Sequence, residues 1–433
     1  MINTVILAVL LFAFLGSGVY VGLSLAGVGI VGLEFLRGLG TTIGAILYNS
    51  ANNFPMAAVP MFLLLGRIVL HTGLSSKLYQ GVSQWTRVIP GGLLHSNILA
   101  CSIFAAVSGS SAATAATIGT VAYGEQKNRK YSPKMILGSL AAGGTLGILI
   151  PPSINMIVYG AYVGASVGRL FAGGIIPGII LSIMFMLYIG FATTRDKSLS
   201  PPRQKITRRY FVDGIIALKD IFPLACIIVL ILGSIYFGIM TPTEAAGASA
   251  FLAIILGIIF GKFNFNILKK SALEALGTTS MVLLLFIGAN VLGYALGLLR
   301  IPKILAELIT SAGLGTMGIW FMVVLLYLIL GCFMDSLAMV LITLPVTYPL
   351  VVELGGFDPI WFGVQLVILC EIGMITPPVG LNLFVIHGIA KDASFGTIVR
   401  GIVPFFVCLL IALILLTFLP DLILFLPERM IGA

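Results

Sequence analysis

Hydroxyl and backbone oxygens that could bind a small cation gather at two interruptions in the apolar first half of this sequence. The turn Ser108-Gly109-Ser110-Ser111 combines a glycine, which permits a sharp bend, with hydroxyls that can bind an ion or cap the next helix. Farther along, Leu149-Ile150-Pro151-Pro152-Ser153 contains a double proline, which cannot continue a helix. Unwound carbonyls at such a break are good ligands for sodium. We predict a first sodium site from Ser108, Gly109, Ser110, Gly147, Ile150, Pro151 and Asn155.

A second break of the same kind occurs in the other half of the chain. Gly373-Met374-Ile375-Thr376-Pro377-Pro378-Val379 repeats the pattern that starts at Gly147, and a turn ending in Asp335 and Ser336 precedes it. A carboxylate deep in a membrane is costly and usually pairs with a cation or carries a proton. We predict a second sodium site from Gly331, Asp335, Ser336, Thr376, Val379, Gly380 and Asn382.

Each turn also has a purely structural explanation. Small residues and hydroxyls let helices pack closely in membranes, so the serines at 108 and 110 could serve packing alone. Asp335 could cap the helix that begins at Ser336, where a carboxylate meets the positive end of the helix dipole. Capping would not exclude a role for Asp335 at an ion site.

Composition places the chain in the membrane. Of its 433 residues 59% are hydrophobic and 9% charged, with a mean hydropathy of +1.14, whereas soluble domains carry about a quarter charged residues. The net charge of +9 is therefore no sign of nucleic-acid binding. The five cysteines lie in apolar runs without a CxxC pair, and the sequence has no phosphate-binding loop, zinc motif or paired nucleophile and base. We expect neither an enzyme nor an ATP-driven pump acting alone.

Apolar segments long enough for helices in a bilayer recur along the whole chain. The first one lacks the early basic residues and the short apolar core of a signal peptide, so we expect an uncleaved helix. The expected spans and half-spans are 2–33, 54–70, 91–107, 111–123, 135–150, 153–163, 173–193, 215–237, 245–260, 280–299, 316–334, 336–352, 360–375, 379–389 and 401–419.

The basic residues predict the orientation of these spans. They cluster at 127–134, 195–209 and 262–270, and loops rich in Lys and Arg face the cytoplasm. All three clusters lie on one side only if 91–123 and 316–352 enter the membrane and return as re-entrant helical hairpins. With both hairpins re-entrant, the number of membrane crossings predicts a cytoplasmic N-terminus and a periplasmic C-terminus.

The expected fold is an all-α polytopic membrane protein with an internal inverted repeat, two re-entrant hairpins and two broken helices. Such repeats are typical of secondary transporters, whose ion and substrate sites lie near mid-membrane. The predicted divisions are an N-terminal helix and connection (1–53), a first repeat (54–194, hairpin 91–123, broken helix 135–163), a cytoplasmic linker (195–212), scaffold helices (213–278), a second repeat (279–419, hairpin 316–352, broken helix 360–389) and a C-terminal tail (420–433).

The chain resembles the large membrane subunit of tripartite ATP-independent periplasmic (TRAP) transporters, the DctM-like family. The resemblance covers nearly the whole length and rests on the segments 55–66, 108–111, 149–153, 334–336 and 376–380. It implies sodium-driven symport of an organic acid, such as sialic acid or a C4-dicarboxylate, across the bacterial inner membrane. It also implies an elevator mechanism and two partners, a small four-helix membrane subunit (Q type) and a periplasmic substrate-binding protein (P type).

Within this resemblance, the half-helices beginning after each turn and break would point free N–H groups at an anionic substrate beside bound sodium. The predicted substrate-binding residues are Ser108, Ser110, Ser111, Ser153, Asn155, Ser336 and Asn382. One alternative is a stand-alone divalent-anion/sodium symporter that needs no binding protein. A second alternative, from another class, is an intramembrane enzyme or a passive channel.

Overall fold

The computed structural model describes residues 2–204, 206–311, 313 and 315–430, and these residues form helices without any β-strand. Three helices begin the chain: α1 (Ile2–Gly16), α2 (Val21–Arg37) and α3 (Ile43–Ala51). The segment 2–33, expected as one helix, is thus divided into α1 and α2. A turn at Ser17 and Gly18 separates them, with Gly18 at a φ of 79°, a conformation that glycine adopts without strain.

One order of elements occurs twice along the chain: a helix, a short helix, a helical hairpin, a broken helix and a long helix. The first copy is α4 (Ala58–His71), α5 (Leu74–Thr86), α6 (Leu93–Ser108), α7 (Ser111–Asn128), α8 (Pro133–Thr145), α9 (Ile154–Val163) and α10 (Val167–Arg195). The second is α14 (Phe265–Leu298), α15 (Ile301–Ser311), α16 (Thr316–Gly331), α17 (Ser336–Tyr348), α18 (Pro359–Met374), α19 (Leu381–Ile389) and α20 (Phe395–Phe418). The expected all-helical fold with two hairpins and two broken helices is confirmed.

Further elements connect and end these copies. Between them lie α11 (Arg208–Ile228), the π-helix η4 (Val229–Gly233), α12 (Ser234–Tyr236) and α13 (Pro242–Phe260). A second π-helix, η5 (Pro349–Leu354), extends α17, and α21 (Asp421–Leu424) follows α20. The 3-10 turns are η1 (Gly40–Thr42), η2 (Pro55–Ala57), η3 (Leu146–Ile148) and η6 (Pro427–Arg429).

The long helix α14 starts earlier than the expected span 280–299. Its first turns contain Lys269 and Lys270, which were expected in a basic loop. The helix begins here because the side chain of Asn264 accepts a hydrogen bond from the backbone N–H of Ile267 (2.8 Å), which caps the first turn. Charged side chains at the end of a helix do not stop it.

Length and composition identify six helical segments in the described residues that could cross a membrane, or seven if a bent pair counts as one span. The six are α10, α13, α14, α20, the segment Tyr210–Tyr236 and the segment Ser336–Leu354. The bent pair joins Gly40–Ala51 to Pro55–His71 at 50°. Shorter apolar helices, among them α6, α9, α16 and α18, are halves of the hairpins and broken helices. The chain is therefore a multi-span membrane protein.

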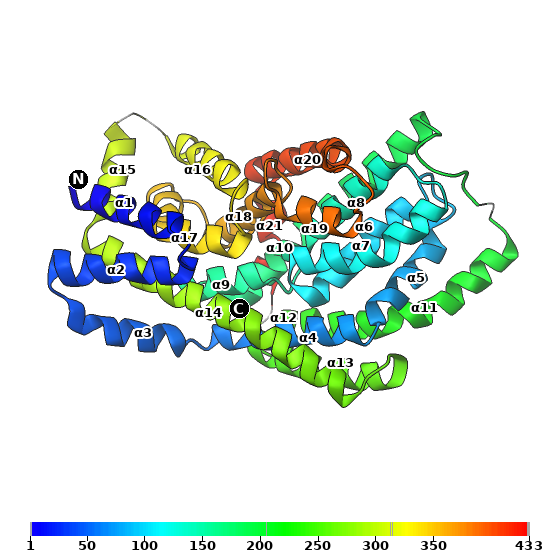
Figure 1. The fold of residues 1–433 in the computed structure, drawn as a ribbon, viewed down its shortest axis with the longest axis horizontal. Coiled ribbons are helices and arrows are strands. Elements are labelled where there is room, and N and C mark those ends of the chain that lie inside the picture. The colour runs from blue at the N-terminus through cyan, green and yellow to red at the C-terminus, as the bar shows by residue number, and fades with distance from the viewer. Residues whose placement is uncertain (1, 205, 312, 314, 431–433) are drawn as a thin grey trace.

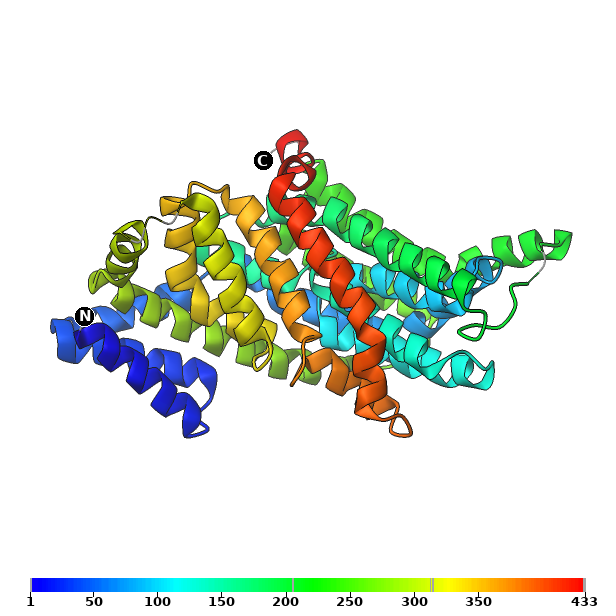
Figure 2. The same ribbon diagram turned by 90° about the horizontal axis from the view of Figure 1, so that it is seen from above.

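The hairpins and broken helices occupy the middle of an elongated molecule. Figure 1 shows α1–α3 and α15 at one end and α5 with α11 at the other, while α14 passes beneath the centre. The helix α14 packs against α2 and α4, α13 packs against α4, and α11 packs against α5. These six helices are called the frame below. In Figure 2 α16, α18 and α20 lie side by side over the central region.

Glycines let each hairpin touch a broken helix at the backbone. A Cβ on Gly147 in the first break would lie 2.6 Å from the carbonyl oxygen of Ser110, and a Cβ on Gly331 would lie 2.5 Å from the Cα of Gly373. No larger residue fits at these distances without displacing backbone. These contacts bring the hairpin tips to the helix breaks.

Candidate functional site

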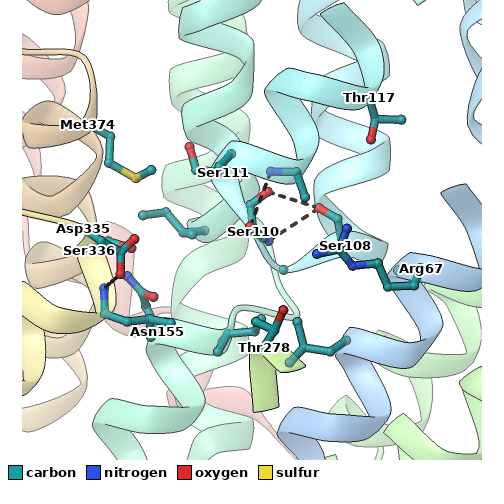
Figure 3. A pocket seen from close by; sticks show the side chains of 18 of the residues that line it. Arg67, Ser108, Ser110, Ser111, Thr117, Asn155, Thr278, Asp335, Ser336 and Met374 are labelled. Carbon is teal, nitrogen blue, oxygen red and sulfur yellow. Dashed lines mark hydrogen bonds between the residues drawn. The ribbon is translucent and has the colours of Figure 1, made fainter. Parts of the chain in front are cut away.

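A cavity of about 120 Å³ lies where the two hairpin tips meet the first broken helix and two helices of the outer frame. Its polar lining is shown in Figure 3, with Arg67 on one side of the first tip and Asp335 on the other. The lining residues are Leu63, Gly66, Arg67, Leu70, Phe104, Ser108, Gly109, Ser110, Ser111, Ala112, Ala113, Thr117, Ile148, Ile154, Asn155, Thr278, Met281, Asp335, Ser336, Leu337 and Met374.

Hydroxyls at the first hairpin tip are hydrogen-bonded to one another and to the turn itself. The hydroxyls of Ser108 and Thr114 lie 2.7 Å apart, and Thr114 donates to the carbonyl of Ser110 (2.8 Å). The Ser110 hydroxyl accepts from the backbone N–H of Ala113 (3.4 Å), so it caps α7. Ser108 is buried and Ser110 half-buried. The tip is therefore a compact set of oxygens beside the cavity.

The first helix break lies directly against this tip. The 3-10 turn η3 ends α8, and the side chain of Ser153 then caps α9 by accepting from the backbone N–H of Met156 (3.4 Å). A Cβ on Gly109 would lie 3.0 Å from the carbonyl oxygen of Pro152. Tip and break are thus in contact, and the side chain of Ile150 packs against Gly178 of α10. Of the residues predicted for the first sodium site, Ser108, Gly109, Ser110 and Asn155 line the cavity, while Gly147, Ile150 and Pro151 lie outside its lining, as does Ser153.

The second hairpin tip confirms that Asp335 caps a helix. Its Oδ2 accepts a hydrogen bond from the backbone N–H of Leu337 (3.1 Å) at the start of α17. The same carboxylate lines the cavity. The hydroxyl of Thr376 donates to the carbonyl of Ile372 (2.6 Å). Asp335 is therefore both the N-cap of α17 and a lining residue of the cavity.

The two helix breaks differ in burial. Pro151, Pro152 and Ser153 are buried, whereas Pro377, Pro378 and Val379 are exposed. Gly380, at a φ of 54°, then starts α19 without a side-chain cap. Of the residues predicted for the second sodium site, Asp335 and Ser336 line the cavity, while Gly331, Thr376, Val379, Gly380 and Asn382 lie outside its lining.

The two half-helices that follow the breaks reach across to the opposite hairpin. α9 packs against α17, and α19 packs against α7. Asn382 on α19 donates from Nδ2 to the hydroxyl of Ser111 (2.7 Å), which donates to the carbonyl of Gly144 (2.9 Å). Asn155 on α9 lies beside Asp335 and Ser336 (Figure 3). Each asparagine thus lies at the hairpin of the other repeat, a pairing that the order of the motifs does not reveal.

Both asparagines have a buried amide atom that no protein group satisfies among the described residues. The Nδ2 of Asn155 and the Oδ1 of Asn382 are buried and have no hydrogen-bond partner among the described residues. Buried polar atoms are nearly always paired with protein, water or a bound group. A free amide oxygen suits a cation, and a free amide N–H suits a carboxylate oxygen.

Comparison with known proteins assigns the chain to a family. The family model of the DctM component of tripartite ATP-independent periplasmic transporters matches residues 8–422. The chain belongs to the DctM family. It is 36% identical over 383 residues to the C4-dicarboxylate TRAP transporter large permease protein DctM of Pseudomonas aeruginosa, covering 88% of both chains. It is 32% identical over 427 residues to the sialic acid TRAP transporter large permease protein SiaM of Vibrio cholerae, covering 98% of both.

A solved structure supports the fold of this DctM-family chain. The crystal structure of the YdaH transporter from Alcanivorax borkumensis superposes with a TM-score of 0.55, covering 91% of this chain and 88% of the other. Sequence identity is 14%, so this similarity concerns the fold alone. The chain is thus a transporter permease subunit, and such subunits are not enzymes.

Sequence reasoning gave no specific role to Arg67, a cavity residue of this DctM-family chain. Arg67 on α4 lines the cavity, and its Nη1 lies 3.3 Å from Oε2 of Glu274 on α14. His71 Nε2 lies 2.9 Å from the same oxygen. The signal in the sequence was a basic residue inside the apolar run 54–70, where a charge is functional as a rule.

Glu371 remains outside the cavity lining. It is fully buried in α18, and neither carboxyl oxygen has a hydrogen-bond partner among the described residues. It lies about one helical turn before the second break. His71 contacts Glu274, and His95 lies 2.7 Å from the carbonyl of Pro90.

Proposed function

We propose that this DctM-family subunit carries an organic acid across the bacterial inner membrane together with sodium, after a periplasmic binding protein has delivered the acid. The observation that carries this proposal is the cavity, in which both hairpin tips, the first break and two frame helices converge. It offers hydroxyl and amide groups between one cationic and one anionic side chain. That composition suits an anion and a small cation bound close together.

Sodium fits the chemistry of both tips. The first tip and break bring together hydroxyl oxygens and backbone carbonyls, and the second adds the Asp335 carboxylate. Sodium prefers such hard oxygen ligands. A bound cation strengthens the binding of a nearby carboxylate, and the carboxylate strengthens the binding of the cation by the same factor. A few kcal/mol of this coupling makes a carrier without sodium a poor carrier of the acid.

The arrangement of helices supports an elevator mechanism. The hairpins and broken helices contribute most of the cavity wall, while Arg67, Thr278 and their neighbours come from α4 and α14 of the frame. A substrate in the cavity would therefore touch both parts of the molecule. Movement of the central part past the frame would carry the site from one membrane face to the other.

The partners and substrates are proposed from the family. The matched family is a component of a tripartite transporter, so we propose a small membrane subunit of the Q type and a periplasmic protein of the P type as partners. The two relatives described above are named for a C4-dicarboxylate and for sialic acid. We accordingly propose a carboxylate of this range as the substrate, with the basic loops and the N-terminus on the cytoplasmic side.

Uptake into proteoliposomes tests the proposal. Vesicles containing this chain and its small subunit receive the binding protein outside, with labelled succinate or N-acetylneuraminate and an inward sodium gradient. We expect saturable uptake that needs both the gradient and the binding protein. Uptake without binding protein would favour a stand-alone symporter, and a non-saturating current would indicate a channel. Equal uptake in sodium and in potassium would refute sodium coupling.

A further inference from the structure

We propose that Arg67 binds the carboxylate of the substrate and that Glu274 is its resident counter-ion, which the substrate replaces. This inference rests on the proposed function and adds to it the group that recognises the acid. It concerns residues of the frame, whereas the hairpin tips and breaks were the basis of the sites predicted above.

The position of Arg67 is fixed by a close approach between α4 and the first hairpin. A Cβ on Gly66, the residue before Arg67, would lie 3.2 Å from the Cα of Ser108. The guanidinium consequently enters the cavity next to the Ser108–Ser110 tip (Figure 3). Among the cavity-lining residues, all of which the structure describes, Arg67 is the only cation and Asp335 the only anion. Arg67 is therefore the one lining side chain whose charge is opposite to that of an anionic substrate.

The contact between Arg67 and Glu274 leaves most of the guanidinium available. The closest approach is 3.3 Å from Nη1 to Oε2, longer than the two-pronged Arg–carboxylate pairs at about 2.7–2.9 Å. Glu274 Oε2 is also shared with His71. The two side chains are 30% and 32% exposed. Arg67 lines the cavity while Glu274 lies outside its lining, so a ligand in the cavity can reach the guanidinium. A substrate carboxylate can form the forked pair with Arg67 that Glu274 does not form.

Exchange of one carboxylate for another fits the demands of a carrier. With the cavity empty, Glu274 keeps Arg67 paired, which avoids the cost of an unpaired charge. When substrate binds, its carboxylate takes over the guanidinium, and when substrate leaves, Glu274 returns. Glu274 therefore weakens binding and assists release. Removing it should tighten binding and slow turnover, an outcome that a merely structural ion pair would not produce.

Binding and transport together test this inference. The chain and its small subunit are placed in nanodiscs in sodium buffer, and thermal unfolding is followed as succinate or N-acetylneuraminate is added, which gives the half-saturating concentration of each acid. Succinamide and N-acetylneuraminate methyl ester are the neutral analogues for comparison. We expect an acid to stabilise the wild type and its neutral analogue not to do so. Arg67→Ala should raise the half-saturating concentration at least about tenfold, and Arg67→Lys should raise it less. Glu274→Gln should lower it severalfold and also lower the maximal uptake rate.

Matched controls are available at the C-terminal end of α7, where Nη2 of Arg129, the residue after the helix, pairs with Glu125 Oε1 at 2.8 Å outside the cavity lining. Arg129→Ala and Glu125→Gln should leave acid binding unchanged. If Arg67→Ala has the same half-saturating acid concentration as the wild type, or if Glu274→Gln binds the acid more weakly, the inference is wrong. Sodium-dependent uptake by the wild type would still support the proposed function in that case. Absence of both binding and uptake with either acid would overturn the proposed function as well. If Arg67→Ala does not fold, Arg67→Lys and Glu274→Gln decide the matter.

Discussion

At the scale of single residues, polar side chains at and near the cavity make a structural hydrogen bond through one atom, and that bond does not use their other polar atom. Asp335 caps α17 through Oδ2, and Oδ1 takes no part in that hydrogen bond. Asn382 donates to Ser111 through Nδ2 while its Oδ1 stays unpaired among the described residues. For Asp335, capping and ligand binding are therefore not competing explanations, and a substitution that keeps the cap can separate the two functions.

Asp335→Asn is such a substitution. Asparagine caps helices about as well as aspartate, so the folded protein should persist while the negative charge is lost. We expect the sodium concentration that half-activates uptake to rise at least about tenfold, since interactions with a charged group contribute about 1.5–3 kcal/mol. The measurement is the initial uptake rate against sodium concentration.

Asp358 provides the control for this substitution. Its Oδ1 accepts from the backbone N–H groups of Ile360 (2.7 Å) and Trp361 (3.0 Å) at the start of α18, outside the cavity lining. Asp358→Asn should leave sodium activation unchanged. Identical sodium activation in the Asp335→Asn variant and the wild type would remove Asp335 from the ion site.

At the scale of elements, the sequence was most informative where Gly and Pro dictate the backbone. The hairpins and broken helices end within a few residues of their predicted bounds, because the double prolines and the Ser108–Ser110 turn exclude helix locally. The separation of α1 from α2 was not predicted, since Ser17 and Gly18 are compatible with a continuous helix. The crossing of Asn155 and Asn382 to opposite hairpins depends on how α9 and α19 pack, which local patterns do not encode.

Gly331→Ala tests the contact between the second hairpin and the second broken helix. The added Cβ would meet the Cα of Gly373 at 2.5 Å, so backbone must move. We expect a loss of about 1–3 kcal/mol of stability, the usual cost of overpacking, seen as a lower unfolding temperature of the purified protein. Gly297→Ala on α14 is the control, because nothing lies within 4 Å of its Cβ. Equal unfolding temperatures for the two variants would show that the helices separate freely here.

At the scale of the whole molecule, a polar link between α7 and the connection from α19 to α20 joins the two repeats. Asp392, in the connection between α19 and α20, lies 2.5 Å from Lys127 Nζ and accepts hydrogen bonds from the Tyr123 hydroxyl at 3.0 Å. The hydrogen bond from Lys127, which has the larger effect, and the hydrogen bond from Tyr123 hold the pKa of the Asp392 carboxyl below its usual value. The link spans α7 of the first repeat and the end of the second.

The lowered pKa of Asp392 predicts a pH dependence with a definite sign. A carboxyl whose pKa is lower in the folded than in the unfolded protein stabilises the fold above its unfolded pKa, and this stabilisation disappears as pH falls through the folded pKa. Asp392→Asn should therefore lower the unfolding temperature slightly near neutral pH. The difference from wild type should shrink as pH falls below about 4 and vanish only below the folded pKa of Asp392. Unfolding temperatures from pH 7 to pH 3 provide the measurement. A difference that widened toward acid would contradict the assignment.

The cavity wall draws on both repeats, with Ser108 and Asn155 from one and Asp335 and Ser336 from the other. A gene encoding a single copy of the motif could therefore have produced this wall only if two separate polypeptides associated. Joining the copies in one chain ensures that the complementary half is always present in equal amount. It also lets the sequences of the two copies diverge, so that the buried break and the exposed break can acquire different functions.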